Sequence, residues 1–319
     1  MEPKPPPVSK HLVLDPDYGR DAARYYLGDA LDAGRELVAY GANLLLRCFQ
    51  TMERTLDNGM LLGVLFRQSI AALDGFMLCL ENGAVSAAAV HSRGALEASF
   101  YIEFMLRRGK KEWAKRIWVY SLRQNLGWVR RMLPGRPERD QYLEGRKQMG
   151  LLPAEPTEEE VRGSLATERE MLERLTADDL RDLNAAFEAV ASKKGYEPDW
   201  FRPGKDGVSS VYKMACELGR QNEYDTFYRS LSWSVHGSHA FTSAIIQGSS
   251  IGIHPLRDLE QFKLVFSFGV NTALKTCIEV IREYRPDEEK WFARKYRAEW
   301  EDRLRNLPEI NFELDPRVL

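Results

Sequence analysis

The chain has 319 residues, of which 44% are hydrophobic and 29% are charged, and its 45 basic and 47 acidic side chains leave a net charge of −2. This composition is typical of a soluble globular protein and excludes a chain that is disordered throughout. A net charge so close to zero also excludes a strong overall attraction to nucleic acid or to anionic membranes, although a local basic patch remains compatible with it.

The first residues lack the basic start and the apolar stretch of a signal peptide. The most apolar region, residues 60–90, is interrupted by Arg67, Asp74 and Glu81, which makes it too polar for a bilayer span of roughly 20 apolar residues. No C-x-x-C pair occurs, so a reducing compartment is expected. We therefore expect a cytoplasmic protein that has no membrane partner. The four cysteines stand far apart: Cys48, Cys79, Cys216 and Cys277.

Residues 1–16 contain five prolines and predict a flexible tail. From about residue 17 to residue 57, apolar side chains recur at three- and four-residue steps, which predicts a long helix for packing or dimerisation. The pair Asn58-Gly59 is expected to end this helix.

Three amphipathic helices are predicted between residues 60 and 133, where the pattern is strongest. Asn82-Gly83, Gly109 and Pro134 are expected to end them. Because the connections are short, these helices should pack antiparallel as the core of a bundle. Their predicted ranges are 60–80, 84–108 and 111–133.

Residues 134–156 are polar and contain four prolines, so they predict a surface excursion. Thr157 and Glu160 form a capping-box pattern, which predicts a strongly charged helix as far as about Lys194. The loop that follows carries Trp200 and Phe201, which should pin it to the body of the protein.

Shorter helices are predicted at residues 209–220 and 223–236, followed by an irregular segment, residues 237–256, which contains three glycines. Two closing helices are predicted at residues 256–284 and 287–306. The chain is therefore expected to be all-α: a multi-helix bundle with antiparallel core helices and a charged helical insertion. The expected layout is one domain over residues 17–319, with its core at about 60–284 and the insertion at 134–195.

The common nucleotide-binding and zinc-protease motifs are absent from the sequence. One hydrolase motif, G-x-S-x-G, is matched by residues 248–252 and would make Ser250 a nucleophile. In hydrolases that serine needs a sharp turn between a parallel strand and a helix. No such pattern is predicted here, so we interpret this segment as a plain loop.

Polar residues occur on two segments where a core helix would favour apolar ones. Arg93, Glu97 and Tyr101 are four residues apart and share one helix face. The same helix carries many apolar residues, so we expect these polar groups to lie near or within the bundle. The second segment has a similar repeat: Tyr228, Ser232 and His236 are four residues apart, Arg229 precedes His236 by seven, and His239 follows one turn later.

The sequence also leaves structural interpretations open. Arg93 and Glu97 would form a buried salt bridge that fixes helix register. His236 would be a hydrogen-bonded core imidazole or a cation at a helix end. Glu103 and residues 107–108 are expected to be solvated surface.

The runs VSAAAVHSRGALEASFYIEFML and DWF…SSVYKMACELGRQNEYDTFYRSLSWSVHG resemble the bacterial family of unknown function DUF5677. The family pattern is a helix with R-x3-E and a later helix with Y-x3-S-x3-H. The resemblance covers about residues 60–284 and implies an all-helical fold without an established activity. The matching positions are Arg93, Glu97, Tyr228, Ser232 and His236.

More distantly, the chain resembles the HEPN superfamily of helical bundles, many of which are metal-independent ribonucleases of toxin–antitoxin and phage-defence systems. Their signature is an arginine, four to six residues, and a histidine, which Arg229 and His236 satisfy. The resemblance implies a homodimer, no cofactor and no metal ligand. It also implies RNA or a small phosphate-containing ligand as the partner.

On this hypothesis His236 is the general acid or base, since imidazole titrates near neutral pH. Arg229 holds the phosphate, and Arg93 and Glu97 orient the imidazole or bind phosphate. The predicted catalytic residues are His236, Arg229, Arg93 and Glu97. The predicted binding residues are Tyr228, Ser232, His239 and Tyr101.

Two alternatives remain. One is a non-enzymatic binding or regulatory module, in which the polar cluster is structural or receives a ligand. The other is a metal-dependent hydrolase that uses His236, His239 and a carboxylate such as Glu97. Against the ribonuclease hypothesis, the sequence shows no clear surface that combines aromatic and basic residues for RNA.

Overall fold

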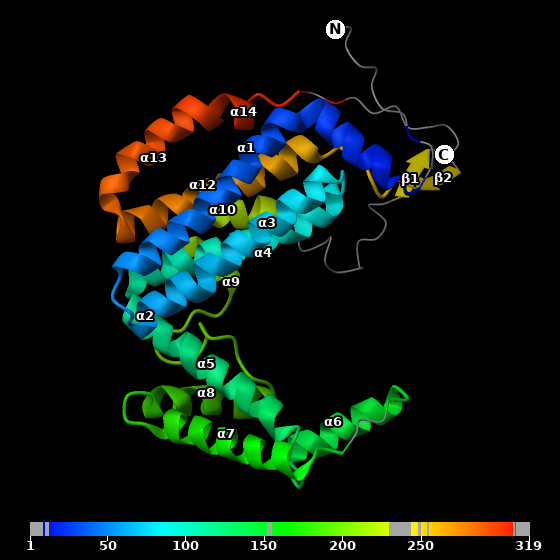
Figure 1. Ribbon diagram of the computed structural model, residues 1–319. Coiled ribbons are helices and arrows are strands. Elements are labelled where there is room, and N and C mark those ends of the chain that lie inside the picture. Colours follow the sequence, from blue (N-terminus) through cyan, green and yellow to red (C-terminus); the bar gives the residue numbers. More distant parts are fainter. Residues whose placement is uncertain are drawn as a thin grey trace, which may run out of the picture. The chain divides into compact units, whose positions relative to one another are not determined.

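The structure is a computed structural model, and it describes residues 9, 13–151, 155–229, 244–247, 250–253, 255–308 and 310 (Figure 1). The chain forms two compact units. The first unit comprises Met1–Arg108 and Met214–Leu319, and the second unit comprises Gly109–Lys213. In both units the described residues are mainly helical, which confirms the predicted all-α bundle.

The first unit begins with a long helix, α1 (Pro16–Thr51). Its N-terminus is capped by Asp15, whose carboxylate accepts a hydrogen bond from the backbone N–H of Tyr18 at 3.0 Å. A proline stands at its first position, where a missing N–H costs nothing. Its buried residues recur at helical spacing, so one face of α1 lies against the core.

The break after α1 differs from the prediction. The chain re-enters a helix at Leu56, and α2 (Leu56–Asn58), the π-helical stretch η1 (Gly59–Phe66) and α3 (Arg67–Glu81) follow one another without interruption. The prediction that Asn58-Gly59 ends a helix is therefore wrong. The two residues lie near a helix start instead, where the Asn58 amide donates to the backbone oxygen of Glu53 at 3.0 Å.

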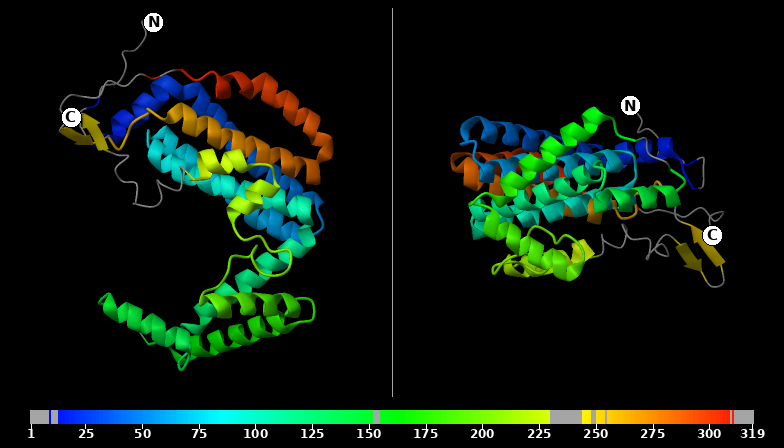
Figure 2. Two further views of the ribbon diagram at one scale, coloured as in Figure 1. Left: turned by 180° about the vertical axis from the view of Figure 1, so that it is seen from behind. Right: turned by 90° about the horizontal axis from the view of Figure 1, so that it is seen from below.

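Four long helices form the core of the first unit: α1, α3, α4 (Val85–Arg108) and α12 (Phe262–Tyr284). α3 packs on α4, α12 packs on α4, and α1 packs on α3 (Figure 2). The turn between α3 and α4 uses Gly83 at φ +66°, a backbone conformation that favours glycine. Its largest fully buried side chains include six phenylalanines: Phe66, Phe76, Phe100, Phe104, Phe262 and Phe266.

Two helical stretches, Leu56–Glu81 and Phe262–Tyr284, are long and apolar enough to span a membrane, with a mean hydropathy of 1.4 in their most apolar windows. The core helix of a soluble protein meets the same criterion, so this composition is weak evidence for a span. Both stretches pack on the other helices of the bundle.

The chain beyond α12 continues through α13 (Glu289–Lys295), the π-helical stretch Tyr296–Trp300 and α14 (Glu301–Arg305). Trp300 is fully buried, and its indole N–H donates to Glu36 of α1 at 2.9 Å. This hydrogen bond anchors α13 and α14 on α1. Both helices lie within residues 287–306, where the sequence predicts a helix.

The second unit is made of α5 (Lys110–Arg130), α6 (Pro137–Gln148), α7 (Glu158–Thr176) and α8 (Arg181–Lys194). α5 packs on each of the other three helices, so this unit includes α5 as well as the predicted insertion. The predicted capping box is present, because Thr157 and Glu160 each accept a hydrogen bond from the other's backbone N–H. The residues of its hydrophobic core are Val119, Leu122, Leu126, Leu175, Leu180 and Phe187.

Two predictions for this unit are corrected. The polar excursion contains α6, which starts at Pro137 and is so polar that Arg139 is its one buried residue. The charged helix is divided at Ala177, because the turn there brings the fully buried Leu180 into the core and places Asp179 on Arg174 at 2.8 Å. The loop is pinned as predicted, with Trp200 and Phe201 buried.

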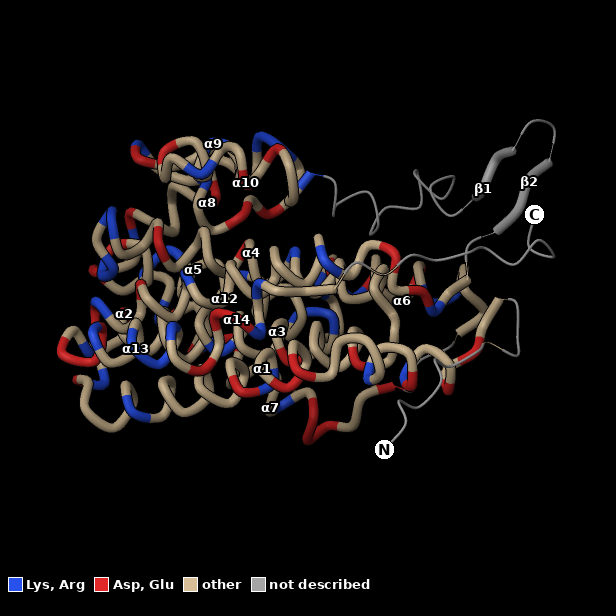
Figure 3. The backbone as a smooth tube through the Cα atoms, turned by 90° about the horizontal axis from the view of Figure 1, so that it is seen from above, with Lys and Arg blue, Asp and Glu red and all other residues tan. Residues whose placement is uncertain are grey.

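The segment predicted as irregular contains a short hairpin of β1 (Ala244–Gln247) and β2 (Ser250–Ile253). The strands are antiparallel, and Gln247 pairs with Ser250. Ser250 thus begins a hairpin strand, not the strand–turn–helix that a hydrolase nucleophile requires. Basic and acidic residues are interspersed along the backbone, consistent with the near-zero net charge (Figure 3).

Two glycines inside helices should respond in opposite directions to replacement by alanine. A Cβ at Gly269 of α12 would lie 2.6 Å from Cζ of Phe76, whose ring is fully buried and has no space to move into. We expect Gly269→Ala to destabilise the protein by about 1–3 kcal/mol. At Gly28 of α1 the nearest atom would be Nε of Arg24 at 3.5 Å, so Gly28→Ala should stabilise it by about 0.5–1 kcal/mol.

Urea unfolding followed by circular dichroism measures both effects. Equal changes in the free energy of unfolding for the two variants would contradict the close approach of α12 to α3.

Candidate functional site

A polar cluster joins α4 to a segment more than a hundred residues later in the chain. The Tyr228 hydroxyl accepts a hydrogen bond from Nη2 of Arg93 at 3.2 Å and donates one to Oε2 of Glu97 at 3.0 Å. The Tyr101 hydroxyl donates to the other oxygen, Oε1 of Glu97, at 2.6 Å. The two segments singled out in the sequence therefore meet in space.

The expected salt bridge between Arg93 and Glu97 is not formed. The hydroxyl of Tyr228 lies between the two groups and bonds to both. Within the part of the chain that the structure describes, no carboxylate lies within 4.0 Å of the Arg93 guanidinium. Its Nε is buried and has no hydrogen-bond partner there. Arg93 is thus linked to Glu97 through the hydroxyl of a neutral phenol and, among the described residues, not through a direct ion pair.

Tyr228 stays protonated at physiological pH. It is 8% exposed, and burial together with the negative charge of Glu97 raises its pKa to about 12. The guanidinium of Arg93 also lies over the Tyr228 ring, 4.8 Å from its centroid. A neutral phenol can donate to Glu97 and accept from Arg93 at the same time, which keeps the three groups in one arrangement.

The second segment reaches α4 through a tightly folded turn. α9 (Val211–Glu217) is followed by α10 (Gln221–Glu223) and by η2 (Tyr224–Tyr228), a π-helical turn of a kind often found at functional sites. The rings of Tyr224 and Tyr228 stack with centroids 4.8 Å apart. Burial raises the pKa of Tyr224 as well. Arg229 follows directly and is exposed.

The other predicted site residues, Ser232, His236 and His239, lie outside the described residues. The structure therefore brings together Arg93, Glu97, Tyr101 and Tyr228, and whether the histidines join them stays a prediction. Among the residues that the structure does describe, no three His, Cys, Asp or Glu side chains gather closely enough to hold a metal ion. Both carboxylate oxygens of Glu97 already accept hydrogen bonds from tyrosines.

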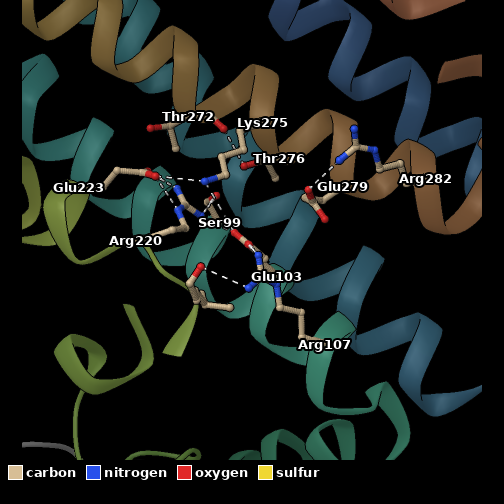
Figure 4. A network of polar contacts seen from close by, with 11 residues as sticks. Ser99, Glu103, Arg107, Arg220, Glu223, Thr272, Lys275, Thr276, Glu279 and Arg282 are labelled. Carbon is tan, nitrogen blue, oxygen red and sulfur yellow. Dashed lines mark hydrogen bonds and ion pairs between the residues drawn. The ribbon is translucent and has the colours of Figure 1, made fainter. Parts of the chain in front are cut away.

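A second polar network was missed in the sequence (Figure 4). Glu103 was expected to be solvated, but it is 2% exposed and forms an ion pair with Arg220 at 3.0 Å. The prediction for Glu103 is wrong because its partner comes from a distant loop. Arg107, expected at the surface, has a side chain that is 55% exposed and reaches back to Glu103.

Arg220 is the centre of this network. It is 3% exposed, and its Nη1 donates to Ser99 Oγ at 2.9 Å as well as to Glu103, while its Nε donates to Glu223 at 2.9 Å. Lys275 of α12 adds a contact to Glu223 at 3.1 Å. Since Arg220 immediately precedes α10, the network fixes the start of the turn that carries Tyr224 and Tyr228.

Removing one partner of the buried Glu103–Arg220 pair should lower the free energy of unfolding strongly. Removing both partners should lower it by less than the sum of the two single losses. Glu103→Leu leaves the Arg220 guanidinium buried with one acid fewer, and we expect a loss of about 3–5 kcal/mol in the free energy of unfolding. In the double variant Glu103→Leu/Arg220→Met, Glu223 keeps Lys275 as its partner. Urea unfolding of the two single variants and the double variant measures the coupling. Strictly additive losses would show that the pair does not act as a unit.

The stability contributed by Tyr228 should depend on pH. Its pKa is about 12 in the folded chain against about 10 for an ordinary tyrosine, so folding favours the protonated phenol. That contribution is fully present below about pH 10 and is lost as the pH rises toward about 12. Near pH 7, Tyr228→Phe should be less stable than the wild type by about 1–3 kcal/mol, because Arg93 and Glu97 each lose a partner. Urea unfolding across this range should show the difference narrowing above about pH 10. A constant difference would contradict the raised pKa.

Comparison with known proteins bears on most of the chain. The model of the "Family of unknown function (DUF5677)" matches residues 59–252, which is more than half of the 319 residues. No curated protein and no solved structure matches the chain. The matched region contains α4, α10 and η2, and hence every residue of the polar cluster around Tyr228. The chain belongs to the DUF5677 family.

Proposed function

We propose that this chain is a metal-independent ribonuclease in which Arg93 and Arg229 bind a phosphate of RNA and His236 transfers the protons. The observation that carries the proposal is the state of Arg93. Its guanidinium is oriented by Tyr228 through a hydrogen bond at 3.2 Å and by contact with the ring face, and no carboxylate of the described chain lies within 4.0 Å of it. An arginine that is held in position and has no direct carboxylate partner is suited to bind a phosphate diester.

The role of Glu97 supports this assignment. Its carboxylate accepts hydrogen bonds from Tyr101 and Tyr228, so its negative charge is spread over two phenols and does not pair directly with Arg93. Arg229 follows Tyr228 and is exposed, so a second cation stands next to the cluster in the sequence. Its spacing to His236 is the one that HEPN ribonucleases use, a likeness that supports the proposal.

In the proposed reaction the ribose 2′-hydroxyl attacks the adjacent phosphorus, the P–O2′ bond forms and the P–O5′ bond breaks. A neutral imidazole takes the proton of the 2′-hydroxyl, and an imidazolium gives a proton to the leaving 5′-oxygen. A homodimer, which we include in the proposal, would supply two copies of His236 for these two transfers. The arginines would stabilise the charge that builds on the phosphate.

A second candidate is a non-enzymatic binding or regulatory module. The observation that favours it is that Tyr228 and Tyr101 both donate hydrogen bonds to Glu97, an arrangement that also serves a purely structural role. In that case Arg93 would hold a phosphate-containing ligand and no bond would be cleaved.

RNA cleavage in excess EDTA tests the proposal. We expect the wild-type protein to cleave single-stranded RNA of mixed sequence, and His236→Ala to lose about a hundredfold or more of that rate, since the variant lacks the acid–base group. Circular dichroism checks that the variant is folded. His91→Ala is the matched control, because His91 is an exposed histidine of α4 outside the cluster, and it should keep full activity.

Absence of cleavage by the wild type, or an unchanged rate in folded His236→Ala, would contradict the ribonuclease proposal. Binding of RNA without cleavage would support the binding module instead.

A further inference from the structure

The second unit contains an open groove of about 730 Å³ between α5, α7 and α8. Two large aromatic side chains line it and are mostly exposed: Trp128 of α5 and Tyr196, which follows α8, are each 58% exposed. Exposed aromatic rings are costly to leave in water, so a pair of them on one groove needs an explanation. Their flat faces suit another flat apolar surface.

Each ring is accompanied by a cation. The guanidinium of Arg131 lies over the Trp128 ring at 4.0 Å from its centroid, and Nζ of Lys194 lies 5.6 Å from the centroid of Tyr196. Neither Arg131 nor Lys194 meets a carboxylate within ion-pair distance in the described parts of the chain. The two cations are thus available to an anionic ligand.

The acids that line the groove are already paired. Glu197 receives two hydrogen bonds from Arg123, at 2.9 and 2.6 Å, and Glu188 lies 3.4 Å from the same arginine. Glu138 pairs with Arg130 at 3.3 Å. Three arginines and three glutamates line the groove, so its walls are close to neutral. Arg131 and Lys194, which lie beside the two exposed rings, are cations that have no carboxylate within ion-pair distance in the described chain.

We infer that this groove binds a segment of single-stranded RNA, whose unpaired bases stack on Trp128 and Tyr196 while its phosphates meet Arg131 and Lys194. Stacking platforms next to cations are the usual means of binding single-stranded nucleic acid, because every base has a flat face and every phosphate is negative. A duplex hides those faces. The choice of RNA rests on the proposed function, and the groove would be a docking site separate from the cluster around Tyr228.

Fluorescence anisotropy tests the inference. A labelled single-stranded RNA of mixed sequence is titrated in EDTA with His236→Ala protein, so that cleavage does not interfere. Adding Trp128→Ala and Tyr196→Ala should raise the Kd about tenfold or more, because two stacking faces are lost. Replacing both residues by phenylalanine should restore most of the affinity. Trp291→Ala is the matched control, since Trp291 is 47% exposed in the first unit, and it should leave the Kd unchanged.

The cations have a separate signature. Replacing Arg131 and Lys194 by glutamine should weaken binding. The slope of log Kd against log salt concentration should become shallower by up to about 2, because binding then neutralises two fewer phosphates and releases fewer counterions. A duplex of the same sequence should compete poorly with the single strand.

An unchanged Kd in the folded double-alanine variant would overturn the inference, and so would an equal loss in Trp291→Ala or equal competition by the duplex. These outcomes are independent of catalysis. If RNA binding requires Trp128 and Tyr196 but the wild-type protein cleaves no RNA, the inference about the groove stands and the ribonuclease proposal is wrong. If cleavage requires His236 but the double-alanine variant keeps its RNA affinity, the ribonuclease proposal stands and the inference about the groove is wrong.

Discussion

The ion pair between Glu103 and Arg220 is the contact on which the arrangement of the first unit depends. Both side chains are almost fully buried, and a charge in that position is tolerated only with a partner and further hydrogen bonds. Ser99, Glu223 and Lys275 supply those bonds and bring α4, the start of α10 and α12 to one point. The pair therefore fixes where the chain returns to α4 after the second unit.

That fixed return places Tyr228 about two turns of α4 away, between Arg93 and Glu97. The two polar layers differ in character. Around Arg220 acid and base meet directly, whereas around Tyr228 a neutral phenol separates them, so that the Arg93 guanidinium makes no direct ion pair in the described chain. The first layer is suited to hold the structure, and the second is suited to receive an anion.

Much of the fold follows from local sequence. Gly83 and Gly109 end helices as predicted, and each adopts a positive φ that other residues rarely take. The burial of Glu103 could not be predicted, because its partner is 117 residues away and local periodicity carries no information about distant pairs. The same limit applies to the candidate site: the spacing on α4 was visible, but the insertion of Tyr228 between the charges was not.

The order of the two units along the chain has a consequence for synthesis. The second unit is one continuous segment, Gly109–Lys213, whereas the first unit is assembled from pieces on either side of it. On a ribosome the second unit can complete its own core while α4 still waits for α12. Until α12 emerges, the side of α4 on which it packs has no cover from α12. The nascent chain therefore exposes apolar residues of α4 throughout the synthesis of the second unit, and a chaperone would bind it at this stage.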